Sequence, residues 1–100
     1  MANKSNRSKI DRIIEDATVD AYGEEEQTVG WESLLTASIK TPQECFVGKV
    51  ACALLGIAGN GRCISAKVRA GKITFTTNIE GIRLKDKRQQ LYIDAYKEWL

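Results

Sequence analysis

Acidic side chains crowd into one short stretch of this chain, and they are the residues whose types and spacing could do chemistry. Between Asp11 and Glu32 there are eight acidic residues and a single base, Arg12. The other 78 residues carry 14 bases against 5 acids, which brings the net charge of the 100-residue chain to +2. Two neighbouring carboxylates repel each other by about 1 kcal/mol even in bulk water. The block therefore indicates a solvated helix face or a place where a cation or a basic partner binds.

The spacing of these acids predicts that some of them converge. Asp16 and Asp20 are four residues apart, so on a helix they lie on one face. Three glutamates at 24–26 follow across a bend at Gly23. Oxygen ligands without histidine or cysteine suit a hard cation, calcium before magnesium. Residues 93–96 near the end of the chain are similar to residues 19–22 around Asp20, and this similarity could bring Asp94 to the same site.

A purely structural interpretation of the same acids is also open. Glutamates in the first turn of a helix stabilise it, because the backbone N–H groups there favour negative charge. The segment also lacks the D-x-D-x-D-G spacing of an EF-hand loop and its twelfth-position glutamate. Acids that coat a solvated face and begin a second helix would need no ion.

Catalysis is not expected from this chain. It contains no histidine, which removes the serine–histidine and cysteine–histidine nucleophile pairs and most zinc sites. No nucleophile, oxyanion donor or cofactor motif accompanies the carboxylates. The three cysteines, Cys45, Cys52 and Cys63, form no C-x-x-C motif, and we expect them to pack as small hydrophobic residues.

Helical periodicity marks both ends of the chain. Apolar residues at helical spacing predict a helix over about residues 9–21, which ends near Gly23, and a second helix from Glu24 until Pro42 stops it. The tail predicts a closing helix from about Asp86. The apolar stripe of the second helix is expected to be Val29, Trp31, Leu34, Leu35 and Ile39.

The middle of the chain has the two-residue period of strands. Residues 46–57 predict one or two strands bent at glycines, and residues 64–70 form a hairpin with 72–79. A short strand follows at 82–84. In the second arm of the hairpin, the side chains expected to face inward are Ile73, Phe75, Thr77 and Ile79. We therefore predict an α+β fold, with an N-terminal helical hairpin, a small antiparallel curled sheet in the form of an SH3-like barrel, and a C-terminal helix.

Length and composition fit one small domain, since 43% of the residues are hydrophobic. Residues 1–8 are polar and basic and are predicted to be a flexible N-terminus, and residues 9–100 are predicted to form the domain. The start does not resemble a secretory signal. No apolar run approaches the roughly 20 residues that cross a bilayer. We therefore expect a soluble, cytoplasmic protein without a membrane partner.

The hairpin also predicts a basic surface. Lys67, Arg69 and Lys72 are expected to point outward from it, and such a face can hold phosphate backbones. It offers no exposed aromatic ring for base stacking, because Phe75 falls on the inward side. We therefore do not expect nucleic acid as a partner, beyond weak and salt-sensitive association.

The acidic run at 14–27, followed by Gly30-Trp31, resembles a family of small bacterial calcium-binding proteins of the cyanobacterial heterocyst type. The order of the parts is similar too: an acidic helical hairpin, a small barrel-like sheet and a C-terminal aromatic stretch such as 92–99. The resemblance implies a single domain of this family's fold with calcium as the bound ion. The chain departs from the family's pattern in the loop at 59–62, where Gly-Asn-Gly-Arg stands in place of further acids, and in its positive net charge. The metal ligands that the resemblance implies are Asp16, Asp20, Glu24 and Glu25, with Glu26 in reserve.

Two functional hypotheses follow. The first is a small calcium-binding protein, acting as a buffer or sensor, that uses a carboxylate cluster at a helix–helix bend. The alternative is a non-enzymatic protein-interaction module, such as a phage or mobile-element inhibitor, that presents its acidic surface to a basic nucleic-acid-binding partner.

Overall fold

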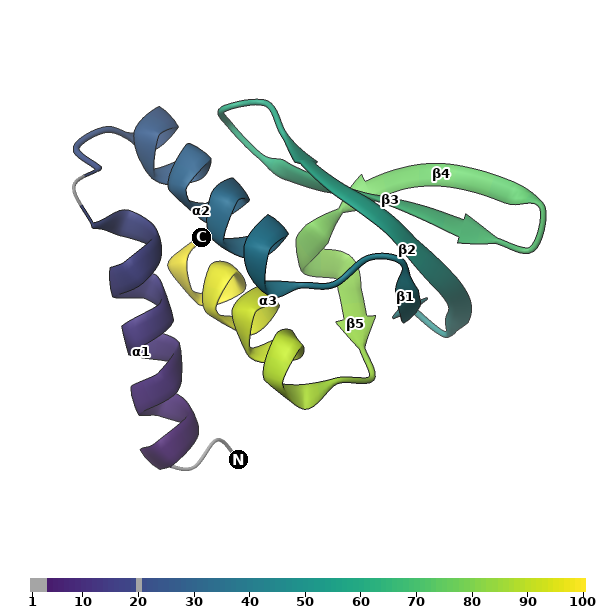
Figure 1. Cartoon of the computed structure of the whole chain (residues 1–100), viewed down its shortest axis with the longest axis horizontal. Coiled ribbons are helices and arrows are strands. Elements are labelled where there is room, and N and C mark those ends of the chain that lie inside the picture. Colours follow the sequence, from purple (N-terminus) through teal and green to yellow (C-terminus); the bar gives the residue numbers. More distant parts are fainter. Residues whose placement is uncertain (1–3, 20) are drawn as a thin grey trace.

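The computed structural model describes residues 4–19 and 21–100 of the chain (Figure 1). In chain order the elements are α1 (Lys4–Thr18), α2 (Glu24–Ser38), β1 (Gln43–Val47), β2 (Val50–Gly59), β3 (Ile64–Ala70), β4 (Ile73–Asn78), the 3-10 helix η1 (Ile79–Gly81), β5 (Ile82–Leu84) and α3 (Lys87–Trp99). Within the described residues, no helix combines the length and the apolar character needed to span a membrane. The predicted α+β order, with a helical hairpin first and a closing helix last, is confirmed.

The strands form one antiparallel sheet in the order β4-β3-β2-β1-β5. Tight turns set its register, and Gly48 and Gly71 in two of them have a φ of +62°, which a residue with a Cβ rarely adopts. The pairing of β2 with β3 shifts between Leu54 and Gly56. This bulge bends β2, so the sheet curls as the glycines of the sequence predicted.

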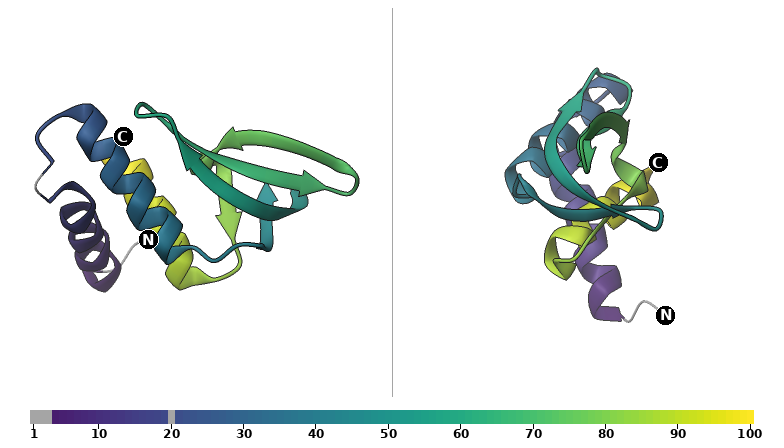
Figure 2. Two further views of the ribbon diagram at one scale, coloured as in Figure 1. Left: turned by 45° about the horizontal axis from the view of Figure 1, so that its top comes forward. Right: turned by 90° about the vertical axis from the view of Figure 1, so that its right-hand side faces the viewer.

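The helices cover one side of the sheet in two layers (Figure 2). α2 packs on β2, α3 packs on β5 and η1, and α1 lies outside them against both helices. Trp31 of α2 is completely buried, with its ring 5.4 Å from that of Tyr96 and 5.8 Å from that of Trp99 in α3. Other buried apolar side chains include Ile10, Ile13, Leu35, Leu54, Ile64, Val68, Ile79 and Ile93. One core therefore joins the helices to the sheet.

The prediction of an SH3-like barrel is wrong, because the sheet is open. Within the described residues, β4 pairs only with β3 and β5 only with β1, so the two edge strands do not meet. The short helix η1 carries the chain from one edge to the other and buries Ile79 completely. α3 packs against η1 and β5. The sheet is therefore covered by a helix instead of closing on itself.

Helix α1 begins at Lys4 and ends at Thr18, whereas the sequence predicted a helix over about 9–21. The backbone is thus helical from residue 4 onward, and residues 1–3 lie outside the described part of the chain. Arg7 contributes to this early start, since its guanidinium contacts the carboxylates of Asp11 and Glu98, each at 2.9 Å. The contact with Glu98 spans almost the whole chain, so sequence spacing alone could not predict it.

Three side chains that the sequence placed in the interior are exposed instead. Val29 is 54% exposed because it lies on the outer face of α2. Ile73 is 68% exposed because it begins the edge strand β4. Cys63 is exposed in the β2–β3 loop, whereas Cys45 and Cys52 are buried as expected.

Candidate metal centre

Three glutamates of the acidic block form the first turn of α2. Glu24, Glu25 and Glu26 follow Gly23, the N-cap residue, whose backbone is extended. All three side chains are exposed. Their charge lies at the helix end where unpaired N–H groups point outward, so it stabilises the start of α2. The structural interpretation of these acids therefore has direct support.

Glu26 is engaged in holding the bend before α2. Its Oε2 accepts a hydrogen bond of 3.1 Å from the backbone N–H of Tyr22. Next to it, the side-chain amide of Gln27 donates to the carbonyl oxygen of Ala21 at 3.3 Å. Among the residues that the structure describes, Glu26 is thus the one of the three glutamates whose carboxylate has a partner.

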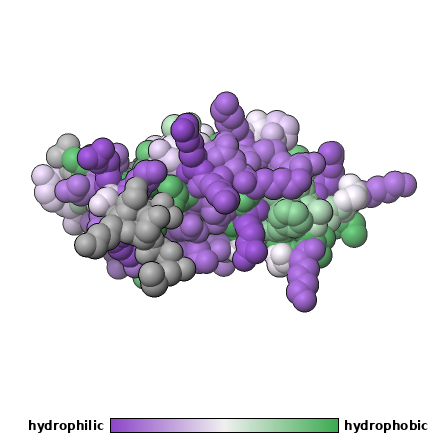
Figure 3. All heavy atoms as spheres, turned by 90° about the horizontal axis from the view of Figure 1, so that it is seen from below, coloured by the Kyte–Doolittle hydropathy of each residue, from purple (hydrophilic) through white to green (hydrophobic). Residues whose placement is uncertain are grey.

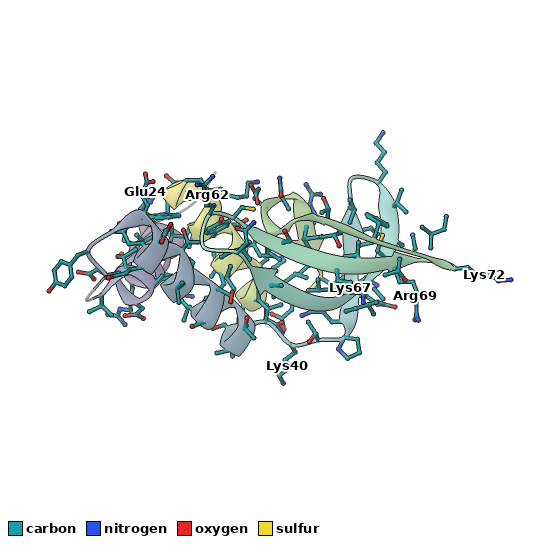
Figure 4. The ribbon with its side chains drawn as sticks, turned by 90° about the horizontal axis from the view of Figure 1, so that it is seen from above. Glu24, Lys40, Arg62, Lys67, Arg69 and Lys72 are labelled. Atoms are coloured by element: carbon teal, nitrogen blue, oxygen red, sulfur yellow. The ribbon has the colours of Figure 1, made fainter. Side chains whose placement is uncertain are left out.

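Glu24 and Glu25 line a groove where the start of α2, the β2–β3 loop and the end of α3 meet. Its other lining residues include Thr28, Gly61, Arg62 and Trp99, and its volume is about 640 Å³. Glu24 and Arg62 lie at the same end of the molecule, on different elements (Figure 4). The ion pairs of the described residues involve neither Glu24 nor Glu25. Both carboxylates are therefore open to an incoming cation.

The β2–β3 loop that forms one wall of this groove is held by its own side chain. Asn60 Oδ1 accepts hydrogen bonds from the backbone N–H groups of Arg62 and Cys63, both at 3.0 Å. Glu32 of α2 reaches the last residue of β2, next to this loop, because a Cβ added to Gly59 would lie 2.5 Å from its Oε2. A further acid of the block, which was not among the predicted ligands, thus lies at the end of β2.

Asp16, another predicted ligand, does not share this groove. It lines a different one, between α1 and α3, together with Lys9, Arg12 and Arg88. Asp20 lies outside the described residues. In residues 4–19 and 21–100, no three acidic or cysteine side chains are grouped so that they could hold a metal ion. The described part of the chain therefore brings together Glu24 and Glu25 but leaves Asp16 apart.

Glu24 and Glu25 supply oxygen ligands of the kind that calcium takes. Consecutive residues of a helix point about 100° apart, so the two side chains converge on one ion only partly. Calcium binds about six to eight oxygens, so two carboxylates would have to be supplemented by backbone carbonyls and water. The two carboxylates are of the right chemical type for calcium, but they supply only part of the oxygens that the ion binds.

Another cleft, of about 710 Å³, is lined by residues that the sequence analysis left unconnected. Asp94 lies here and not beside Glu24, and its Oδ1 accepts a hydrogen bond of 3.0 Å from the side chain of Gln90. Glu80 also lines it, with one buried carboxylate oxygen that has no partner among the described residues. Burial raises the pKa of Tyr96, and the nearby Glu80 carboxylate adds to the shift.

The bases of this cleft are Lys9, Arg83, Lys87, Arg88 and Lys97. They are spread from residue 9 to residue 97, so no local sequence signal reveals their grouping.

The basic side chains of the hairpin are placed as predicted. Lys67 and Arg69 of β3 are exposed and lie across from Thr76 and Thr74 of β4, and Lys72 lies at the hairpin tip (Figure 4). Viewed from below, the surface of the molecule is mainly hydrophilic and has a hydrophobic patch at the end formed by the sheet (Figure 3). These bases form an extended solvated surface along a strand.

Comparison with known proteins places this arrangement in a known fold. No family model matches the chain, and no curated protein is significantly similar to it in sequence. Two solved structures resemble it over 99% of its length. One is the crystal structure of Anabaena CcbP, with 19% identity, 91% of that chain covered and a TM-score of 0.75. The other is a calcium-binding protein in its calcium-binding form, with 21% identity, 94% coverage and a TM-score of 0.76. The chain therefore has the fold shared by these two proteins.

Proposed function

We propose that this protein is a non-enzymatic calcium-binding protein whose ion binds at the bend between α1 and α2. The observation that carries the proposal is the likeness of its whole fold to a protein solved in its calcium-binding form. It is supported by two exposed carboxylates, Glu24 and Glu25, that line a groove at the bend. Both come from the segment that the sequence singled out for an ion.

The proposed ligands are Glu24 and Glu25 from the first turn of α2, together with Asp20, which lies four residues before Glu24 in the sequence. Asp16 has a lesser role in the proposal, because its side chain lines the groove beside Arg12 and Arg88. Arg62 on the opposite wall also opposes cation binding through its charge. A site with few carboxylates binds calcium weakly, in the range of about 10⁻⁴–10⁻³ M. We therefore propose that the protein acts as a sensor of high local calcium concentrations and not as a tight calcium buffer.

Calorimetric titration of the protein with calcium at moderate salt tests this function. We expect a saturable heat with calcium and a weaker response to magnesium, which demands stricter octahedral geometry. Asp20→Ala and the double variant Glu24→Gln/Glu25→Gln should each weaken binding by about tenfold or more, which corresponds to about 1.4 kcal/mol. The matched control is Asp11→Asn/Glu98→Gln, which removes the same charge from two acids that contact Arg7.

Two results would reject the calcium proposal. One is heat indistinguishable from buffer dilution up to millimolar calcium. The other is equal weakening by the double variant and by its control, since that would assign the effect to overall charge and not to a site. The control pair is therefore essential to the interpretation.

The protein-interaction alternative has one observation in its favour: Glu24 and Glu25 are exposed and take no part in the ion pairs of the described residues. Carboxylates free of intramolecular partners can meet a basic surface as well as an ion. Pull-down from cell extract with and without a chelator separates the two functions. Capture of one basic partner that persists in chelator, together with silent calorimetry, would favour the interaction module.

A further inference from the structure

Strand β4 forms one open edge of the sheet. It pairs with β3 on one side, and within the described residues no strand pairs with its other side. Figures 1 and 2 show the β3–β4 hairpin extending away from the helices, with no helix lying along its outer edge. The opposite edge, β5, has only three residues and packs against α3. β4 is therefore the longer and less protected edge.

The turn that precedes β4 shows which of its backbone groups are free. Gly71 and Lys72 form a two-residue turn, and Ala70 pairs with Ile73 across it. The pair that closes such a turn is hydrogen-bonded, and hydrogen bonding alternates along a strand. The N–H and C=O groups of Thr74 and Thr76 therefore point away from β3, toward the open side.

The side chains of β4 do nothing to block this edge. The strand reads Ile-Thr-Phe-Thr-Thr-Asn from Ile73 to Asn78 and contains no charged residue and no proline. Edge strands are usually protected from pairing by lysine, proline or inward-pointing charge. Ile73 is 68% exposed, and Thr74 and Thr76 are exposed as well. An unprotected strand of high β-propensity is a template for another strand.

We propose that two copies of this chain associate through β4, antiparallel across a two-fold axis, so that their sheets join into one. The residues Thr74-Phe75-Thr76 read the same in both directions, which makes the edge self-complementary. In this register Phe75 lies opposite Phe75 of the second copy, and Thr74 lies opposite its Thr76. The two Thr74–Thr76 pairs exchange the free backbone hydrogen bonds, and the paired aromatic rings pack together.

The charges around β4 are compatible with this pairing and disfavour other occupants. Lys67 and Arg69 stand one strand back, so their charges do not meet those of the second copy. Lys72 lies opposite Asn78, which is uncharged. From Ile73 to Asn78 the edge itself carries no charge that an acidic or a basic peptide would recognise, whereas a second identical strand matches it along this length. The association concerns the sheet edge and does not depend on the proposed calcium site. Because a single strand pair buries little area, the dimer should be weak.

Sedimentation equilibrium of the full chain, from micromolar to near-millimolar concentration, tests the proposal. We expect a reversible monomer–dimer equilibrium. Thr76→Pro removes an N–H that points outward and leaves the pairing with β3 intact, so it should weaken the dimer by about tenfold or more. Thr76→Val, the matched control, keeps the backbone donor and should dimerise as the parent does. Thr76→Lys serves as a second disrupting variant, with far-ultraviolet circular dichroism to show that each variant is folded.

Disulfide trapping tests the register in a Cys63→Ser background, because Cys63 is the exposed native thiol. The Cα atoms of a hydrogen-bonded antiparallel pair lie about 5.5 Å apart, within the range that a disulfide spans. A mixture of Thr74→Cys and Thr76→Cys chains should cross-link on mild oxidation, and each variant alone should cross-link far less. A chain that stays monomeric at all concentrations, or variants that cross-link alone as readily as the mixture, would overturn the proposal.

Discussion

Gly30 of α2 lies directly against the backbone carbonyl of Ala17 in α1. A Cβ added to Gly30 would overlap the Ala17 carbonyl oxygen. The two helices thus approach backbone to backbone at this point, which only glycine permits. The contact sets how the hairpin closes, and with it the position of the bend that carries the proposed calcium ligands.

Gly30→Ala should destabilise the protein, although the same change in an exposed helix normally stabilises it by roughly 0.5–1 kcal/mol. The added methyl must push α1 away, and overpacking of this kind costs about 1–3 kcal/mol. Thermal unfolding followed by circular dichroism should show a midpoint lower by about 5–15 °C. Ser33→Ala, on an exposed part of α2, is the control and should not lower the midpoint. A Gly30→Ala midpoint at or above that of the parent would show that the helices can separate at no cost.

Trp31 should tolerate phenylalanine far better than alanine. Its ring is fully buried between Tyr96 and Trp99, and its Nε1 has no hydrogen-bond partner among the described residues. Trp31→Ala removes the packing and should cost about 3–5 kcal/mol in the free energy of unfolding. Trp31→Phe loses ring volume but also removes an unpaired buried donor, so its cost should be about 1.5 kcal/mol or less. Urea unfolding measures both; a Phe variant as unstable as the Ala variant would show that the indole N–H is needed.

Asp86 should make part of the stability depend on acid pH. Its Oδ1 accepts hydrogen bonds from the backbone N–H groups of Arg88 at 2.9 Å and Gln89 at 3.1 Å, which cap α3. The bond from the Gln89 N–H is the main cause that lowers the pKa of Asp86 in the folded protein. Because the folded pKa is depressed, this contribution is present above the unfolded pKa of about 3.9 and is lost as pH falls through the folded value.

Asp86→Asn tests this pH dependence, because asparagine still accepts the capping bonds but does not titrate there. Between about pH 5 and pH 2, the variant should lose less stability than the parent. The salt bridge with Lys85 likewise lowers the pKa of Glu44, and this contribution is common to both proteins, so their difference isolates Asp86. Parallel pH profiles of the two unfolding midpoints would contradict the assignment.

The three thiols should react in two classes. Cys63 is exposed in its loop, whereas Cys45 and Cys52 are buried in paired positions on β1 and β2. Burial is the main cause that raises the pKa of the Cys45 thiol, which lowers its thiolate content further. A thiol reagent at neutral pH should therefore label one cysteine rapidly and the other two only in denaturant. Loss of the rapid phase in Cys63→Ser would identify it, and rapid labelling of all three in the native protein would contradict the burial.

Calcium should raise the unfolding temperature if it binds at the bend. An ion present at ten times its dissociation constant stabilises the folded state by about 1.4 kcal/mol, or about 5–10 °C for a chain of this size. A chelator should reverse the shift, and Glu24→Gln/Glu25→Gln should abolish most of it. Scanning calorimetry with calcium, magnesium and chelator checks this, and an equal shift with both ions would point to general screening of the acidic block.

Elements and turns were predicted well from the sequence because their signals are local. The alternation of Ile64, Ala66 and Val68 identified β3, and all three side chains are completely buried. Asp86 marked the start of α3, where it is the N-cap. Periodicity, capping and turn residues act over a few neighbouring positions, so the chain carries them without reference to its fold.

The sequence by itself thus determined the α+β order of the elements and the acidic first turn of α2. It also excluded sites that depend on histidine, because the chain contains none. Only the tertiary structure decided that the sheet stays open, that Asp16 and Asp94 lie in clefts away from Glu24, and that Gly30 meets Ala17. These relationships join segments that are far apart in the chain or on different helix faces. Their geometry depends on how the layers pack, and the packing is set by the whole core at once rather than by any local run of residues.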